Sequence, residues 1–219
     1  MFVNVNKVKL YYEKTGSGEP LILIHGNGES HKIFDAAVSV LKEKFTVYAV
    51  DSRGHGQSSK ITEYHYDDMA EDIYCLIKEL DIQKPVVYGF SDGGIIALLL
   101  AVKHGKDLKS IIASGANTSP QGLVKGFLSA AKIKYFFTHS QRTKLMLCEP
   151  QITDEMLKSI TLPVFLTCGS KDVIKISHSK HIAEKIPNAV LKIFDGEMHG
   201  SYIVNSKKIA YYIIEVCKK

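Results

Sequence analysis

Short apolar stretches alternate with longer mixed stretches along most of the chain. The longer stretches carry apolar side chains at helical spacing, and the short ones have the length of buried strands. Strands separated by helices predict a mostly parallel sheet with helices on both faces. The expected strands are 21–24, 46–50, 85–88, 108–113, 163–168 and 190–194, and the expected helices are roughly 30–44, 69–80, 95–102, 177–186 and 205–216.

Two segments depart from this alternation. Residues 2–5 and 7–13 flank a short polar turn, which predicts an antiparallel hairpin at one edge of the sheet. Between 116 and 160 the alternation stops, and a helical stretch at 123–137 is followed by two shorter apolar stretches. We therefore expect a single domain over residues 1–219 with a small helical cap insertion at 116–160.

The length and composition are those of a globular domain. A chain of 219 residues with 45% hydrophobic content can bury a substantial core. The net charge of +5 comes from Lys and Arg along the whole length, without a basic stripe interleaved with aromatic residues, so we expect no nucleic-acid partner. No apolar run could cross a bilayer and the N-terminus lacks a signal pattern, so we expect a cytoplasmic protein without a membrane partner.

The sequence carries no motif for a metal or a dinucleotide. No H-E-x-x-H is present, and no G-x-G-x-x-G follows a strand. The four cysteines are far apart, form no C-x-x-C pair and lie in or beside apolar segments, which favours reduced core thiols. We expect chemistry without a cofactor or a metal.

A serine motif stands between the apolar stretch at 85–88 and the helical stretch at 95–102. Its residues are Gly89-Phe90-Ser91-Asp92-Gly93-Gly94, which match the G-x-S-x-G pattern of a nucleophile elbow. A residue at the tip of so tight a turn needs a strained backbone, and the flanking glycines remove the Cβ atoms that would collide. The hydroxyl is then left free to react. This motif predicts Ser91 as a nucleophile.

Several motifs in order resemble the α/β-hydrolase superfamily over nearly the whole chain. His25-Gly26 follows one apolar strand, the segment from Asp51 to Ser58 follows the next, and the serine motif, an aspartate and a late histidine followed by Gly200 come after. The resemblance implies the α/β-hydrolase fold and a catalytic triad in the chain order Ser, acid, His.

The resemblance implies His199 as the base that accepts the Ser91 proton, because it follows the last expected strand. Asp172 follows the strand at 163–168 and is expected to orient that histidine. Asp195 is the less favoured alternative, since a residue so near to the histidine more often shapes the turn. The resemblance also implies two oxyanion donors, the backbone N–H groups of Asn27 and Asp92.

Other polar residues are expected to have structural roles. The Asn27 side chain either reaches toward substrate or only tolerates an unusual backbone between two glycines, and the sequence leaves both open. Arg53 and His55 lie in a Gly-rich loop, and the resemblance implies a structural hydrogen bond for His25. Surface positions are expected for His31, His65, His104, His139, His178 and His181.

Apolar residues near the triad and in the cap are expected to line a substrate pocket. They are Phe90, Phe127, Met146, Val173 and Met198. We expect a carboxylesterase that cleaves small or medium acyl esters through an acyl-enzyme. On the same triad the alternatives are carbon–carbon bond (diketone) hydrolysis, lactone hydrolysis, perhydrolysis and acyl transfer, and outside catalysis a low-turnover ligand receptor. The natural substrate and the oligomeric state stay open.

Overall fold

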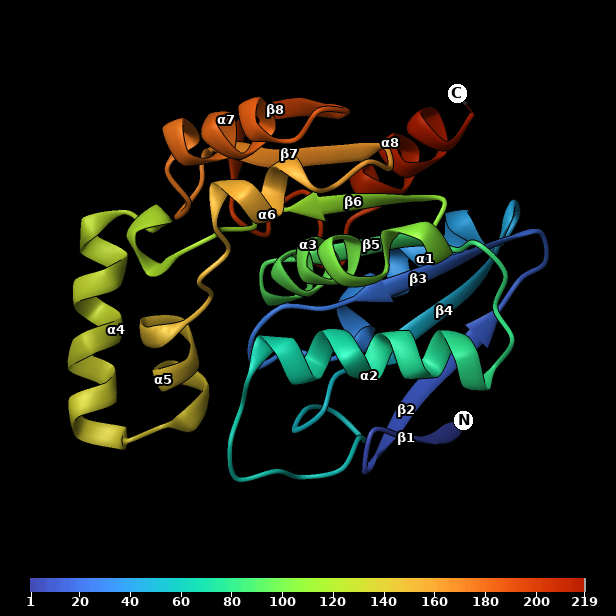
Figure 1. Cartoon of the computed structure of the whole chain (residues 1–219), viewed down its shortest axis with the longest axis horizontal. Coiled ribbons are helices and arrows are strands. Elements are labelled where there is room, and N and C mark those ends of the chain that lie inside the picture. The colour runs from blue at the N-terminus through green and yellow to red at the C-terminus, as the bar shows by residue number, and fades with distance from the viewer. Residues whose placement is uncertain (219) are drawn as a thin grey trace.

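A twisted eight-stranded sheet forms the centre of the protein in the computed structural model, which describes residues 1–218 (Figure 1). The strand order is β1-β2-β4-β3-β5-β6-β7-β8. β1 pairs antiparallel with β2 and β2 with β4, and every later pairing is parallel. This confirms the predicted mostly parallel sheet with an antiparallel N-terminal hairpin. The strands are β1 (Phe2–Val5), β2 (Val8–Thr15), β3 (Glu19–Ile24), β4 (Phe45–Asp51), β5 (Val86–Phe90), β6 (Ser110–Ser114), β7 (Val164–Lys171) and β8 (Ala189–Met198).

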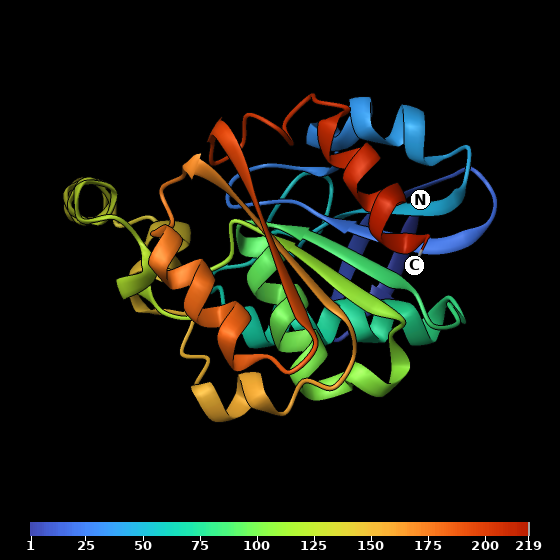
Figure 2. The same ribbon diagram turned by 90° about the horizontal axis from the view of Figure 1, so that it is seen from above.

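Helices cover both faces of the sheet, as the alternation predicted. α1 and α8 pack on one face and α2, α3 and α7 on the other, which Figure 2 shows edge-on. α3 is apolar on all sides because it lies between the sheet and α2, so nearly all its side chains are buried. These helices are α1 (Asp35–Leu41), α2 (Tyr66–Glu79), α3 (Asp92–His104), α7 (Ile176–Lys185) and α8 (Lys208–Cys217), with 3-10 turns at His31–Phe34, Gly105–Asp107 and Pro120–Gly122.

Several element boundaries differ from the sequence prediction, and three of the differences have a cause in the structure. The helix expected at 30–44 is a 3-10 turn followed by the short α1, because the His31 N–H and ring both bind Oδ1 of Asp51 and hold the first turn against β4. β8 runs on to Met198 by pairing with β7 beyond a bulge. The last helix begins at Lys208 rather than 205, since Asn205 has a positive φ of 51°.

Of the histidines expected at the surface, His31 is buried and His178 is half-buried, so that prediction was wrong for His31 and only partly right for His178. His31 is 3% exposed, and its Nδ1 lies 2.7 Å from Oδ1 of Asp51. Nε2 of His178 accepts the N–H of Thr118 at 3.0 Å, and burial lowers the pKa of His178 to about 4. His31 meets the last residue of β4 and His178 meets a loop 60 positions away, and the local helical pattern reveals neither contact.

The segment predicted as a cap lies between β6 and β7 and contains three helices. α4 (Lys125–Thr138) and α5 (Gln141–Cys148) form a hairpin that projects from the carboxyl edge of the sheet, whereas α6 (Asp154–Lys158) packs against α3 and α7 (Figure 1). The boundaries 116–160 of a functional cap stay a prediction. Within residues 1–218, no helix combines the length and the apolar character needed to cross a bilayer.

Candidate active site

Ser91 occupies the turn between β5 and α3, with φ 55° and ψ −114°. Its N–H donates to the carbonyl of Ser114 at 2.8 Å, which fixes the turn to β6. A Cβ at Gly89 would collide with the carbonyl of Gly93, and one at Gly93 with the carbonyl of Ile24. Only glycine fits at both flanks, so the sequence forces the strained serine into a fixed position.

The structure brings Ser91, His199 and Asp172 together from three separate loops. Ser91 Oγ lies 3.0 Å from Nε2 of His199, and Nδ1 of that ring lies 2.6 Å from Oδ1 of Asp172. The hydroxyl can therefore donate to Nε2 while Nδ1–H donates to the carboxylate. The three residues have the hydrogen-bond chain required for a nucleophile, a base and an orienting acid.

The environment of Asp172 favours its ionised form. Its carboxylate accepts the N–H groups of Ile174 at 2.9 Å and Gly169 at 3.2 Å, in addition to the His199 bond. Burial alone would raise the pKa of Asp172, but these hydrogen bonds and the nearby imidazole together hold the pKa below its usual value. Asp195, the less favoured acid, instead accepts from the exposed Ser170 hydroxyl.

Gly115 supports the histidine, and sequence reasoning missed it. It follows β6 with a φ of +59°, and a Cβ there would lie 2.7 Å from Cε1 of His199. On another side of the ring, the Phe90 centroid lies 4.9 Å from that of His199. A glycine directly after a strand was the only signal in the sequence, and it does not reveal which side chain needs the space.

In the described part of the chain, the N–H groups of Asn27 and Asp92 have no hydrogen-bond acceptor. The Gly26 N–H donates to Glu29 and the Gly28 N–H to Nε2 of His55, at 2.9 and 3.0 Å. No hydrogen bond among residues 1–218 uses the N–H of Asn27, or that of Asp92 at the start of α3. These are the two groups that the resemblance predicted as oxyanion donors.

The side chain of Asn27 holds Asp92 rather than pointing freely toward substrate. Its Nδ2 donates to Oδ2 of Asp92 at 2.9 Å and to the carbonyl of Arg142 at 3.3 Å. The Tyr66 hydroxyl donates to Oδ1 of the same carboxylate at 2.8 Å. Burial raises the pKa of Asp92 to about 6 in spite of these two donors. This buried group links the loop that contains Asn27 to α2 and α3.

His25 and Arg53 have structural partners. The Ser52 N–H donates to Nε2 of His25 at 3.1 Å, so Nδ1 carries the proton and donates to the Gly26 carbonyl at 2.7 Å. Burial lowers the pKa of His25 to about 4, which keeps the ring neutral. Arg53 forms two 2.6 Å bonds to the carboxylate of Asp72 on α2.

A small cavity of about 30 Å³ lies over the serine. Phe127, Met146 and Val173 line it, but Phe90 and Met198, also expected there, do not. Phe90 is 3% exposed because its ring packs against that of His199, while Met198 is 60% exposed at the end of β8. The cavity wall also includes residues that sequence reasoning missed, namely Tyr66, Asn117, Leu123, Glu149 and Ile174.

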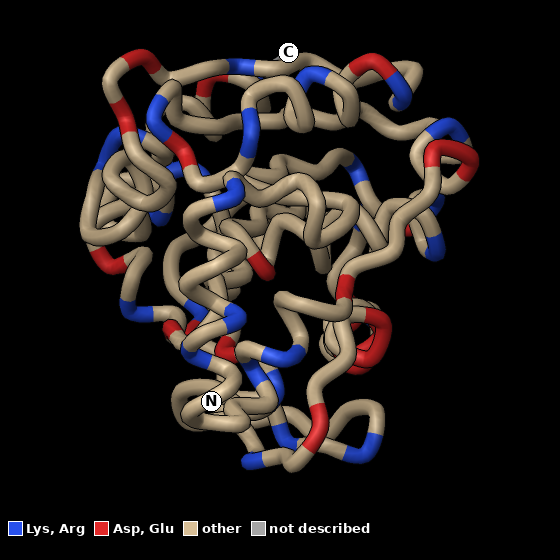
Figure 3. Tube along the Cα trace, turned by 90° about the vertical axis from the view of Figure 1, so that its left-hand side faces the viewer, with Lys and Arg blue, Asp and Glu red and all other residues tan. Residues whose placement is uncertain are grey.

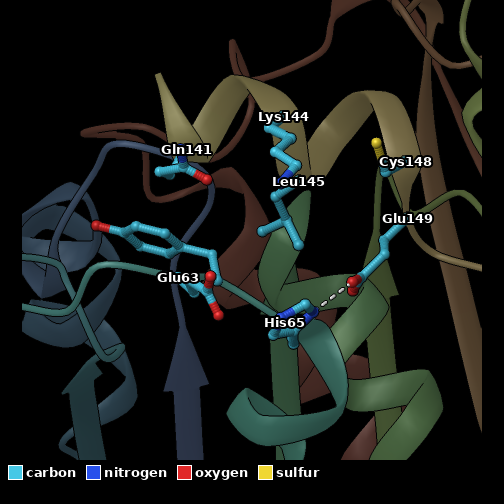
Figure 4. A pocket seen from close by; sticks show the side chains of 8 residues that line it. Glu63, His65, Gln141, Lys144, Leu145, Cys148 and Glu149 are labelled. Atoms are coloured by element: carbon cyan, nitrogen blue, oxygen red, sulfur yellow. Dashed lines mark hydrogen bonds and ion pairs between the residues drawn. The ribbon is translucent and has the colours of Figure 1, made fainter. Parts of the chain in front are cut away.

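A larger cavity of about 230 Å³ lies between α5 and the loop before α2 (Figure 4). Glu149 lines both cavities and crosses from the end of α5 to α2. Its carboxylate lies 2.7 Å from Nδ1 of His65 and accepts the Tyr66 N–H at 3.0 Å. Glu149 therefore separates the two cavities and ties the α4–α5 hairpin to the body of the protein.

Comparison with known proteins identifies relatives across this fold. The family model described as alpha/beta hydrolase fold matches residues 19–138. The AB hydrolase superfamily protein YisY of Bacillus subtilis is 38% identical over 112 residues, which are 50% of this chain and 42% of that protein. The human serine hydrolase BPHL is 36% identical over 124 residues, 52% of this chain and 42% of that protein, so the chain matches less than half the length of either relative. The esterase EaEST from Exiguobacterium antarcticum superposes with a TM-score of 0.87 at 22% identity, over 100% of this chain and 99% of that one.

Proposed function

Because the chain belongs to the alpha/beta hydrolase fold family, we propose that it is a serine hydrolase that cleaves small carboxylic esters. The observation that carries this proposal is the hydrogen-bonded chain from Ser91 through His199 to Asp172, with steps of 3.0 and 2.6 Å. The names of two relatives, a serine hydrolase and an esterase, agree with it.

The proposed reaction follows from the order of these contacts. His199 Nε2 accepts the proton of the Ser91 hydroxyl while Oγ attacks the ester carbonyl carbon, and the Asp172 carboxylate stabilises the resulting imidazolium. Collapse of the tetrahedral intermediate breaks the bond to the alkoxy oxygen, which takes the proton from Nε2 and leaves as the alcohol. A water molecule, deprotonated by the same nitrogen, then hydrolyses the acyl-enzyme and releases the acid.

The two unengaged N–H groups supply the oxyanion site in this proposal. The N–H of Asn27 and that of Asp92 would bind the negative oxygen of the tetrahedral intermediate. Fixed donors of this kind each lower the barrier by about 2.7 to 4 kcal/mol. The bonds from the neighbouring Gly26 and Gly28 N–H groups to Glu29 and His55 hold the loop in this orientation without consuming the Asn27 donor.

The size of the small cavity favours a short acyl group. Its volume of about 30 Å³ is only a few times the roughly 10–15 Å³ that one water needs by the same measure. Phe127 on α4 and Met146 on α5 form part of the wall that limits this volume. We therefore assign acetyl and propionyl esters as the preferred substrates, at the small end of the range expected from the sequence.

Labelling and kinetics with activated esters test the proposal. The protein is expected to hydrolyse p-nitrophenyl acetate with continuing turnover and to be labelled on Ser91 by a fluorophosphonate. Ser91→Ala should lose both, while Ser39→Ala, a change at an exposed serine on α1, should retain both.

Three outcomes would contradict the proposal. Labelling that persists in Ser91→Ala would identify another nucleophile. A single turnover followed by arrest would favour a ligand receptor. Faster cleavage of a lactone or a vinylogous diketone than of any ester would favour one of the alternative reactions on the same triad.

A further inference from the structure

Lys and Arg occur along the whole chain, but the positive charge that acidic residues do not balance falls in one segment. Residues 116–148 contain no Asp or Glu, and the same segment holds all the net charge of +5 that the whole chain carries. The rest of the chain has equal numbers of acidic and basic residues. Most of this segment is the projecting α4–α5 hairpin (Figure 3). Its five cations are Lys125, Lys132, Lys134, Arg142 and Lys144.

The same hairpin exposes large apolar side chains. Ile133, Phe136 and Phe137 on α4 are 61%, 72% and 76% exposed, and the two Phe rings pack edge to face at 5.2 Å. Single exposed apolar residues are ordinary, but three on one helix form a patch of the kind found at interaction surfaces.

The order of residues along α4 separates an inner from an outer face. The inner face contains Leu128, Ala131 and Tyr135, which are three to four positions apart and are partly or fully buried. A second row of residues, on the outer face, is exposed. That row contains Ala130, Ile133 and Phe137, also three to four positions apart. Phe136 lies beside it, with Lys132 on one flank and Lys134 on the other. We refer to these six residues as the outer face of α4.

We propose that the outer face of α4 docks on a lipid surface that bears anionic headgroups. A helix that presents a Phe/Ile row between lysines can place the rings among the acyl chains while the ammonium groups reach the headgroups. The helix stands away from the rest of the fold in Figure 2, so a flat surface can approach it.

A second copy of this chain fits the outer face less well. Symmetric pairing would bring Lys132 and Lys134 of two molecules together, and the apolar row lies on a projecting helix rather than in a groove. A nucleic acid would engage the lysines but leave the Phe and Ile side chains in water. The lipid surface is the occupant that satisfies both the charge and the apolar row.

Vesicle co-sedimentation of the full chain tests this inference independently of any catalytic activity. Vesicles of phosphatidylcholine alone and of phosphatidylcholine mixed with phosphatidylglycerol are compared. The protein is expected to partition onto the mixed vesicles and to be released by high salt, because each lysine near an anionic surface contributes about fivefold to the partition coefficient.

Two double variants separate the apolar and the electrostatic contributions. Phe136→Ser/Phe137→Ser is expected to lower partition at least about tenfold, and Lys132→Glu/Lys134→Glu at least about 25-fold. These side chains point outward, so circular dichroism and urea unfolding should match the wild-type protein. The matched controls, expected to bind as wild type, are Lys180→Glu/Lys192→Glu for the charge change and Val190→Ser/Tyr211→Ser for loss of exposed apolar surface.

Several results would overturn the inference. These are the absence of partition onto either kind of vesicle, equal partition onto both, and unchanged partition of the Phe136→Ser/Phe137→Ser variant. A wild-type dimer in sedimentation velocity that this variant converts to a monomer would instead assign the outer face to contact between copies.

Discussion

Gly115→Ala is expected to disable the proposed base without unfolding the protein. Gly115 follows β6, has a φ of +59° and lies against the ring of His199. A methyl group there would lie 2.7 Å from Cε1 and 2.9 Å from Nδ1 of that ring. The substitution therefore acts on the position of the imidazole, while Ser91 and the oxyanion loop stay in place.

The size of the effect follows from these distances. An ordinary contact needs at least 3.4 Å, so the His199 ring or the backbone must yield by about 0.7 Å. Displacement of a catalytic group by about 1 Å can reduce the rate about a hundredfold, so we expect kcat to fall by about 10- to 100-fold. An alanine in the left-handed region also destabilises the fold by about 1–2 kcal/mol.

The assay combines ester hydrolysis, fluorophosphonate labelling and urea unfolding. KM for p-nitrophenyl acetate should change little, because Gly115 does not line the cavity over Ser91. Both kcat and the labelling rate should fall. Gly126→Ala is the matched control, since a Cβ there meets nothing within 4 Å and the residue is helical. It should keep kcat and gain about 0.5–1 kcal/mol of stability. A folded Gly115→Ala variant whose kcat stayed within about twofold of wild type would show that this contact does not set the position of the base.

Three further predictions concern protonation and pocket size. Burial raises the pKa of Asp92 from 3.8 in the unfolded chain to about 6 in the folded protein. Ionisation of this carboxyl therefore lowers the free energy of unfolding as pH rises from 3.8 through about 6, by about 3 kcal/mol in all. The free energy of unfolding of Asp92→Asn, measured with urea, should therefore rise by about 2 kcal/mol relative to that of wild type between pH 4.5 and pH 7.5. A difference between the two proteins that stays constant across this range would contradict burial of the Asp92 charge. Burial lowers the pKa of His25 from 6.5 to about 4. The contribution of the neutral ring to the free energy of unfolding is therefore fully present above pH 6.5, and about 3 kcal/mol of it is lost as pH falls through 4. An NMR titration of the His25 ring with a midpoint at its ordinary value would exclude this. Met146→Ala should raise kcat/KM for p-nitrophenyl butyrate relative to acetate by about tenfold, since it enlarges the cavity, while Ile133→Ala on the outer face of α4 should leave the ratio unchanged. An unaltered ratio in Met146→Ala would exclude that side chain as the limit on acyl size.

Local patterns were sufficient for the fold, and with the family resemblance they were sufficient for the three proposed catalytic residues. The strand–turn–helix around Ser91 can be recognised from adjacent residues, because the glycines that permit its backbone are its neighbours. Asp172 and His199 follow apolar strands, and in a parallel sheet the carboxyl ends of neighbouring strands lie at one edge. Together with this edge, the resemblance to the α/β-hydrolase superfamily implied that the three side chains meet, and they lie within hydrogen-bonding distance.

Only the tertiary structure decided which residues surround that site. Glu149 reaches Tyr66 from 83 positions away, and Gly115 makes room for a ring 84 positions later, so neither pairing leaves a local trace. The direction of a side chain at the end of a strand also depends on what packs above it, which is why Phe90 lies beneath the histidine and Met198 points to solvent. Periodicity determines elements and their order because it records which face of each segment is buried. It contains no information on which remote side chain fills the space at a given point. The wall of the cavity over Ser91 is made of side chains from such remote segments.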